Sequence, residues 1–286
     1  MPVKILADSA CDLPKDFYAE QNVTLFPLKV QVNGQEYEDV KTIDPKTVYD
    51  AIRGGDVPKT SQVSPLLFEE VFTKMAENNE DGIYIAFSSA LSGTYQTSVM
   101  ILDQVKEKYP NFNLSIVDTK CASLGFGLVV KEAARLAAEN VSKEEILKDV
   151  LFRSQHMEHL FTVEDLDYLA KGGRVSKASA FLGGLLNIKP ILNVEEGKLV
   201  PIEKIRGKKK VYRRIIEIMN ERGDNFKDQI VGISHADTIE TALEVKALIE
   251  GELNPKEVYI SSIGSAVGAH TGPGTISIFF LNKLPS

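Results

Sequence analysis

The sequence is poor in residues that build disulfide-bonded or metal-bound folds: two cysteines, four histidines and no tryptophan occur among 286 residues. Cys11 and Cys121 lack the spacing of a zinc or redox site, which favours two reduced thiols in the cytoplasm. His156 and His159 stand three residues apart without an acidic partner pattern. We therefore expect no metal site and no cofactor.

Long apolar runs are also missing. No stretch approaches the ~20 residues that span a bilayer, and the apolar run before Asp8 is too short for a secretion signal. We therefore expect a cytoplasmic protein without stable membrane insertion. Acidic residues outnumber basic ones and give a formal net charge of −7. This balance does not favour a nucleic-acid partner.

Common catalytic fingerprints are absent or incomplete. The sequence has no Walker-type phosphate loop, and Gly125-Phe126-Gly127 lacks the third glycine of a dinucleotide fingerprint. The segment 232–236, Gly-Ile-Ser-His-Ala, follows a predicted strand but lacks the second glycine of a nucleophile elbow. These patterns give little support to a nucleotide-dependent enzyme or a serine hydrolase.

Predicted strands and helices alternate over the first half of the chain. The strand patterns at 83–87 and 113–118 each lead through a loop into a helix, which indicates a mostly parallel sheet with flanking helices. Asn33-Gly34 predicts the turn of a hairpin near 23–40. We assign residues 1–157 to this N-terminal α/β domain.

From residue 158 the pattern changes. A predicted hairpin at 191–204 is followed by a basic helix at 208–222, and strands and a helix alternate to the end of the chain. Hairpins mixed with helices predict a C-terminal α+β domain over 158–286. The fold class is therefore α/β, in two domains.

Three loops are rich in hydroxyl groups and glycine: Thr60–Ser64, Ser88–Thr94 and Gly268–Thr275. Ligands of open α/β sheets bind at the carboxyl ends of strands, and the N-terminus of a helix attracts anions. The three loops together therefore suit an anionic group, although each alone is consistent with ordinary turns and helix caps. His270, between glycines, is a further candidate donor.

Seven segments, in order along the whole chain, resemble those of the DegV family, whose members include the fatty acid-binding subunits of bacterial fatty acid kinase. They are Asp8-Ser9-x-x-Asp12-Leu13, Thr60-Ser61-Gln62-x-Ser64-Pro65, Ser88-Ser89-x-Leu91-Ser92-Gly93-Thr94-Tyr95-Gln96, Asp118-Thr119-Lys120, Leu166-x-Tyr168-Leu169-x-Lys171-Gly172-Gly173-Arg174, Ile188-Lys189-Pro190-Ile191-Leu192 and Gly268-x-His270-x-Gly272-Pro273-Gly274. Val63 stands where relatives often have proline.

The resemblance implies two α/β-type domains with a long-chain fatty acid in an apolar tunnel between them. It also implies that the carboxylate is bound by the hydroxyl loops and the histidine, here Thr60, Ser61, Ser92, Gly93 and His270. A separate ATP-dependent kinase subunit would phosphorylate the bound acid to an acyl phosphate for phospholipid synthesis. The protein itself would be lipid-binding and not an enzyme.

The apolar segment after Arg174 could line the tunnel, and core packing explains it equally well. Its candidate residues are Phe181, Leu182, Leu185, Leu186 and Ile188. Gly172-Gly173 should end a helix and leave Arg174 in an exposed loop, which suits an acidic or phosphate-bearing partner. Two alternatives stay open: an acyl ester hydrolase using Ser234 or Ser92 with His270, and a binder of another small anion.

Overall fold

The computed structural model describes residues 2–175 and 188–285. The elements in chain order are β1 Lys4–Asp8, η1 Ser9–Cys11, α1 Lys15–Glu20, β2 Val23–Phe26, β3 Lys29–Val32, β4 Gln35–Glu38, α2 Pro45–Arg53, β5 Lys59–Ser61, α3 Pro65–Glu77, β6 Gly82–Ala86, α4 Thr94–Lys108, β7 Leu114–Asp118, α5 Ser123–Ala138, α6 Lys143–His156, β8 Met157–Thr162, α7 Leu166–Lys171, β9 Ile188–Glu195, β10 Lys198–Arg206, α8 Lys208–Arg222, η3 Phe226–Asp228, β11 Ile230–His235, α9 Ile239–Leu253, β12 Glu257–Ser262, α10 Ser265–Thr271 and β13 Ile276–Leu281. Within these ranges, no helix is both long enough and apolar enough to cross a membrane.

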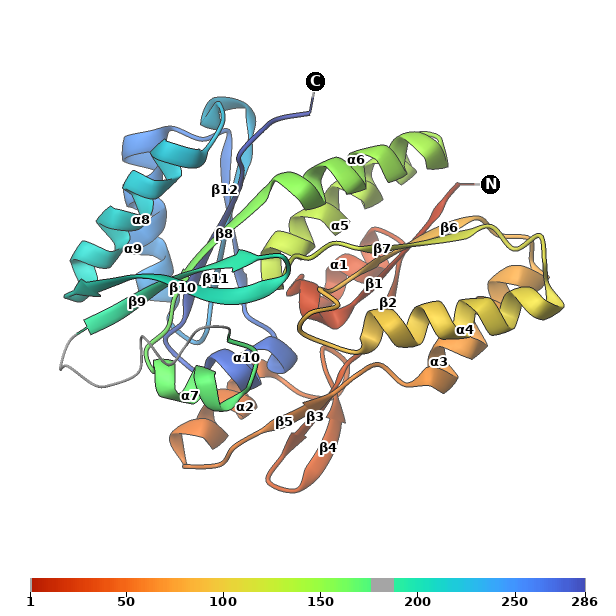
Figure 1. Ribbon diagram of the computed structural model, residues 1–286, viewed down its shortest axis with the longest axis horizontal. Helices are drawn as coiled ribbons and strands as arrows, with labels where there is room; N and C mark the ends of the chain where they lie inside the picture. The colour runs from red at the N-terminus through yellow and green to blue at the C-terminus, as the bar shows by residue number, and fades with distance from the viewer. Residues whose placement is uncertain (1, 176–187, 286) are drawn as a thin grey trace.

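Three sheets organise the chain. A parallel sheet has the order β2-β1-β6-β7, a mixed sheet has the order β10-β9-β8-β13-β11-β12, and a small antiparallel sheet has the order β4-β3-β5. Figure 1 shows the parallel and mixed sheets side by side, with the small sheet and α2 below them. The predicted α/β class with a parallel sheet is confirmed, and the structure adds a separate mixed sheet.

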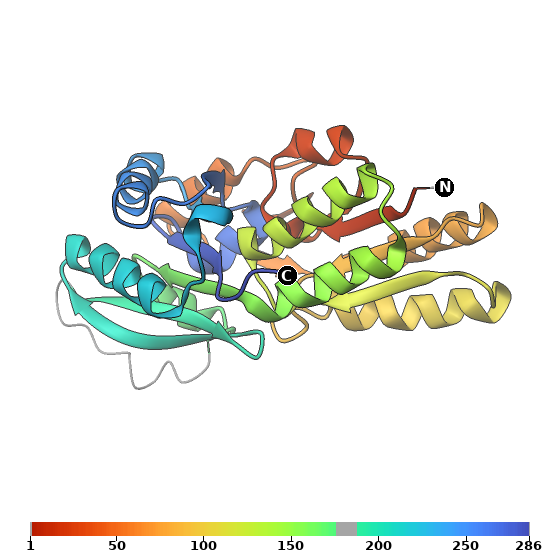
Figure 2. The same cartoon turned by 90° about the horizontal axis from the view of Figure 1, so that it is seen from above.

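The mixed sheet separates a core from a cavity by the alternation of its side chains. Leu160, Ile278 and Phe280 pack into a hydrophobic core with residues of α8 and α9. Their neighbours Phe161 and Phe279 point to the opposite face and line a cavity. Successive side chains of a strand face opposite sides, so one sheet serves both surfaces. Figure 2 shows α8 and the mixed sheet at one end of the molecule and α3 and α4 at the other.

The predicted hairpin near 23–40 is wrong in its first part. Residues 23–26 form β2, which pairs in parallel with β1, and the antiparallel hairpin consists of β3 and β4 alone. Pro27 lies between β2 and β3, and proline has no N–H for a continuous strand ladder. Asn33 and Gly34 both have positive φ, at 49° and 79°, as the predicted turn requires.

The predicted glycine-rich loop around His270 is also wrong, because residues 265–271 form helix α10. Gly268 lies inside this helix, where an added Cβ would stand 2.6 Å from Oη of Tyr49 in α2. Tyr49 is fully buried and donates a hydrogen bond to the carbonyl of Ile263 at 2.7 Å. Late residues of the chain thus pack on early ones, and the division at residue 157 stays a prediction.

Candidate functional site

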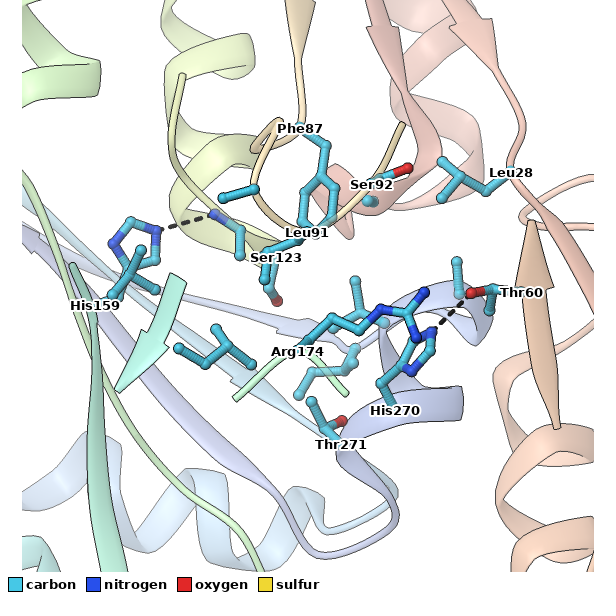
Figure 3. Close-up of a pocket in the computed structure, with 18 of the residues that line it drawn as sticks. Leu28, Thr60, Phe87, Leu91, Ser92, Ser123, His159, Arg174, His270 and Thr271 are labelled. Atoms are coloured by element: carbon cyan, nitrogen blue, oxygen red, sulfur yellow. Dashed lines mark hydrogen bonds between the residues drawn. The ribbon is translucent and has the colours of Figure 1, made fainter. Parts of the chain in front are cut away.

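A cavity of about 390 Å³ lies between the parallel and mixed sheets. Its described lining comes from the mixed sheet, from β5 of the small sheet, from α10 and from segments that follow strands of the parallel sheet. Figure 3 shows eighteen of these residues. The lining residues are Ala10, Leu28, Thr60, Ser61, Gln62, Phe87, Ser89, Ala90, Leu91, Ser92, Gly93, Ala122, Ser123, His159, Phe161, Arg174, Val194, Leu199, Ile263, Ala266, Val267, His270, Thr271, Ser277 and Phe279. Most of this wall is apolar, which suits a hydrophobic ligand.

One end of the cavity carries polar groups from distant parts of the chain. Thr60 in β5 and His270 in α10 are joined by a hydrogen bond of 2.7 Å between Oγ1 and Nε2 (Figure 3). Ser61 follows Thr60 along β5 and also lines the cavity. The five residues predicted to bind a carboxylate are therefore brought to one cavity; their role as ligands stays a prediction.

The loop after β6 supplies Ser92 and Gly93, which lie at the start of α4. Ser92 Oγ lies 2.9 Å from Thr94 Oγ1 and accepts a hydrogen bond from the Thr94 amide at 3.3 Å. Ser92 thus supports the first turn of its helix and also lines the cavity. The amide groups at the beginning of α4 add positive partial charge at this end.

Buried carboxylates hold the loops of this wall in place. Asp8, at the end of β1, accepts hydrogen bonds from the Phe87 amide at 2.9 Å and the Tyr84 hydroxyl at 3.0 Å. Burial raises the pKa of Asp8 to about 7 despite these donors. Asp12 accepts from the Ser123 hydroxyl and, at 2.8 Å, from the Gly264 amide just before α10. Asp12 therefore connects two sides of the cavity.

Arg174 is exposed after the end of α7, as the sequence predicts, and it also lies in the cavity wall; its contact with a partner stays a prediction. Gly172 caps α7 and Gly173 has φ 74°, so the predicted helix end is confirmed. The side chain extends beside His270 (Figure 3). Its guanidinium donates a hydrogen bond to the Gly172 carbonyl. Within the described ranges, Arg174 is the only Lys, Arg, Asp or Glu side chain that lines this cavity.

His270 is neutral at physiological pH in this environment. Burial, and to a smaller extent the Arg174 guanidinium, lowers the pKa of His270 to about 4. The imidazole can therefore act as a neutral hydrogen-bonding group, and Arg174 supplies the fixed positive charge. An anion at this end would meet hydroxyls, one imidazole and one guanidinium.

His159, on β8, was not predicted to be part of the site. Its Nε2 accepts a hydrogen bond from the Ala122 amide at 3.1 Å, and Nδ1 lies 3.1 Å from the Met157 carbonyl. Burial lowers the pKa of His159 to about 4, and its ring packs edge-on against Phe279. Only the pairing of β8 with β13 places it here, and no local motif signals that.

Of the five predicted tunnel residues, only Ile188 lies within the described residues. Phe181, Leu182, Leu185 and Leu186 lie outside the described residues. Ile188 begins β9, pairs with Arg206 and does not belong to the described cavity lining. The observed apolar wall comes from elsewhere, including Leu28, Phe87, Phe161, Val194 and Leu199. These positions read as ordinary core residues in the sequence.

The hydrolase alternative gains little from the geometry. Ser234 is fully buried in β11, and its Oγ lies 3.0 Å from Ser123 Oγ. The hydrogen bonds of the Ser92 hydroxyl go to Thr94, and that of the His270 imidazole goes to Thr60. In the part of the chain that the structure describes, no three His, Cys, Asp or Glu side chains are grouped to hold a metal.

Comparison with known proteins gives a consistent assignment. The model of an uncharacterised family named DegV matches residues 2–283. The DegV domain-containing protein TTE1491 of Caldanaerobacter subterraneus subsp. tengcongensis is 36% identical over 281 residues, which cover 98% of this chain and 99% of that protein. A relative from Clostridium perfringens, CPE0026, is 38% identical over 97% of this chain and 96% of its own length.

Solved structures agree. A DegV family protein from Thermus thermophilus, described as binding fatty acid, is 31% identical with a TM-score of 0.88 and covers 98% of this chain and 99% of its own. The protein TM841 from Thermotoga maritima, described as revealing a fatty acid binding function, is 30% identical with a TM-score of 0.82 over 98% of both chains. This chain belongs to the DegV family.

Proposed function

We propose that this protein binds one long-chain fatty acid in the cavity between the two larger sheets. The observation that carries the proposal is the cavity itself, which is apolar along most of its wall and carries the hydrogen-bonded pair Thr60 and His270 on the side away from His159 (Figure 3). The tail would be stabilised by ~0.8 kcal/mol per buried methylene. For ~15 methylenes the gross gain is roughly 12 kcal/mol, before the entropy cost of binding.

The carboxylate would lie at the polar end, against Thr60, Ser61, Ser92, Gly93 and His270. A buried anion is costly without donors, and this end offers hydroxyls, helix amides and an imidazole. Because Arg174 lines the same cavity, its guanidinium can offset part of the ligand charge. Its exposed position also keeps a partner contact open.

The acid-binding end also suits delivery to a separate enzyme. Ser61 and Gly93 are exposed while they line the cavity, so the carboxylate would lie near solvent. The bound acid would be presented there to an ATP-dependent kinase that forms an acyl phosphate for phospholipid synthesis. This protein would supply the substrate and not the chemistry. We propose that it works in the cytoplasm, where its two free, buried cysteines would stay reduced.

The test is native mass spectrometry of the purified protein, followed by organic extraction of any bound molecule. We expect one fatty acid of long chain per protein, displaced by added oleate. Protein that is free of lipid and does not take up oleate would contradict the proposal. Turnover of an acyl ester that is lost in Ser92→Ala would favour the hydrolase alternative instead. Binding of a short carboxylate but not of oleate would favour the small-anion alternative.

A further inference from the structure

Helix α10 ends with two polar side chains in the cavity wall, and among the described residues only the first has a hydrogen-bond partner. His270 is joined to Thr60, as described above. Thr271 is 8% exposed, and among the described residues its Oγ1 has no hydrogen-bond partner. Figure 3 shows Thr271 on the cavity side of α10, beside His270 and Arg174.

A buried hydroxyl without a partner is uncommon and calls for an explanation. Four other buried polar side chains in the described ranges also have an unpartnered atom: Asp39, Thr162, Asn193 and Ser265. None of these four belongs to the wall of the main cavity, whereas Thr271 does. The free hydroxyl of Thr271 is thus the one that a ligand in this cavity could reach.

The surrounding contacts fix the end of α10, so Thr271 stays at the wall. The Tyr168 hydroxyl donates to the Ala269 carbonyl at 2.7 Å, and the Gly272 amide donates to the Gly268 carbonyl at 2.9 Å. Thr275 Oγ1 donates to the Thr271 carbonyl at 3.1 Å, which ties the backbone to the following turn. These bonds hold the backbone of Thr271 and leave its hydroxyl available.

We propose that Thr271 Oγ1 forms a hydrogen bond with an oxygen atom of the bound acid, close to the carboxylate end of the ligand. The position follows from the chain, because Thr271 is the next residue after His270. The oxygen has two possible sources: the carboxylate itself, or a hydroxyl group on the first carbons of the acyl chain. This inference rests on the proposed fatty acid binding and adds a residue and a ligand preference to it.

The test compares Thr271→Val, which keeps the side-chain shape but removes the hydroxyl, with Thr271→Ser, which keeps the hydroxyl. Binding of hexadecanoic acid and of 3-hydroxyhexadecanoic acid is measured by calorimetry for both variants and the wild type. If the carboxylate is the partner, Thr271→Val weakens both acids by about tenfold to a hundredfold. If the chain hydroxyl is the partner, Thr271→Val weakens only the hydroxy acid, by about threefold to tenfold.

In either case Thr271→Ser should bind closer to the wild type than Thr271→Val does. Equal or tighter binding of both acids to Thr271→Val, with an unchanged melting temperature, overturns the inference. A wild-type protein that binds neither acid contradicts the proposed function as well. The two failures are therefore distinguishable by the wild-type measurement alone.

Discussion

His270 contributes a neutral imidazole at the polar end of the cavity, and its hydrogen bond to Thr60 joins α10 to β5. We expect His270→Ala to weaken fatty acid binding by about 1.5–3 kcal/mol, because a donor to a charged group is lost. Displacement of a fluorescent fatty acid measures the change. His156→Ala is the matched control, since His156 bonds to Asn282 and does not line the cavity. Equal fatty acid affinities of the two variants would show that His270 does not bind the ligand.

Arg174 can contact the bound acid, a partner protein or both, and separate assays of fatty acid binding and acyl phosphate formation distinguish the two roles. We expect Arg174→Ala to keep fatty acid binding within about tenfold of the wild type, because its guanidinium is exposed and solvent screens its charge. Acyl phosphate formation with the kinase should fall much further. Both quantities are measured on the same preparation, with Arg153→Ala as a control outside the cavity wall. Loss of binding in a folded Arg174→Ala protein would assign Arg174 to the lipid site.

His159 makes stability depend on pH with a definite sign. Its pKa in the folded protein is about 4, below the ordinary value of 6.5. The unfolded chain therefore takes up the proton first, and stability is lost as the pH falls from about 6.5 towards 4. One group contributes at most about 1.4 kcal/mol per pH unit to the slope. Asp8, with a pKa raised to about 7, acts in the opposite direction.

The variant His159→Gln keeps an acceptor for the Ala122 amide but does not titrate. Urea unfolding between pH 4 and 7 should show a shallower loss of stability for this variant than for the wild type. At pH 7 His159 is neutral, so the difference in unfolding free energy between the variant and the wild type reflects packing alone. Parallel curves for the two proteins over this range would mean that His159 does not titrate as its burial requires.

At the scale of elements, α10 is a wall of the site that depends on a glycine. An added Cβ at Gly268 would lie 2.6 Å from Tyr49 Oη and 2.8–2.9 Å from two ring carbons. We expect Gly268→Ala to cost about 1–3 kcal/mol of stability and to weaken fatty acid binding, because α10 carries His270. Chemical denaturation and fatty acid titration measure the two effects.

Gly251→Ala in α9 is the matched control for this prediction. Nothing lies within 4 Å of an added Cβ at Gly251, so alanine should stabilise that helix by up to about 1 kcal/mol. Tyr49→Phe removes the nearest atom and should recover part of the loss when combined with Gly268→Ala. A Gly268→Ala protein as stable and as active in binding as the wild type would show that α10 shifts freely.

Elements with strong local patterns could be predicted from the sequence, and those fixed by distant contacts could not. The basic helix was placed at 208–222, the bounds that α8 has in the structure. Helix α10 could not be predicted because it has only seven residues, and its small residues around His270 give no clear helical pattern. Distant contacts stabilise it, among them packing on Tyr49 and the hydrogen bonds that the Gly264 and Ser265 amides donate to the buried carboxylates Asp12 and Asp39. Strand β2 was misassigned because its pairing with β1 depends on the arrangement of the whole parallel sheet and not on the local sequence.

The same distinction holds for the site. Thr60, Ser92 and His270 stand in recognisable motifs and could be chosen as candidates before the structure. His159 could not be chosen, because its side chain reaches the cavity only through the pairing of strands. Thr271 stood inside a predicted hydroxyl-rich loop, but the direction of its side chain depends on a helix end that the sequence did not indicate. Arg174 shows the limit of local reasoning: the helix end before it was predicted, and the direction of its side chain was not.

At the scale of the whole molecule, the cavity is enclosed by segments that are far apart in sequence. Ser123 Oγ of α5 lies 3.0 Å from Ser234 Oγ of β11, and Ser261 donates to the Asp12 carbonyl at 2.6 Å. The tip of the β9–β10 hairpin adds a contact, since Ser88 donates to the Gly197 carbonyl at 2.8 Å. These buried bonds connect the parallel sheet to the mixed sheet around the ligand position.

We therefore expect the two predicted domains to unfold together in one thermal transition. Because the bound acid would contact both sheets, saturating oleate should stabilise the whole protein by about 2.7 kcal/mol at a free concentration of 100 times Kd. Calorimetry with increasing oleate measures this, and hexadecane, which lacks the carboxylate, is the control that should give a smaller shift. Two transitions, of which oleate moves only one, would show that the cavity belongs to a single domain and that the halves are not coupled through the ligand.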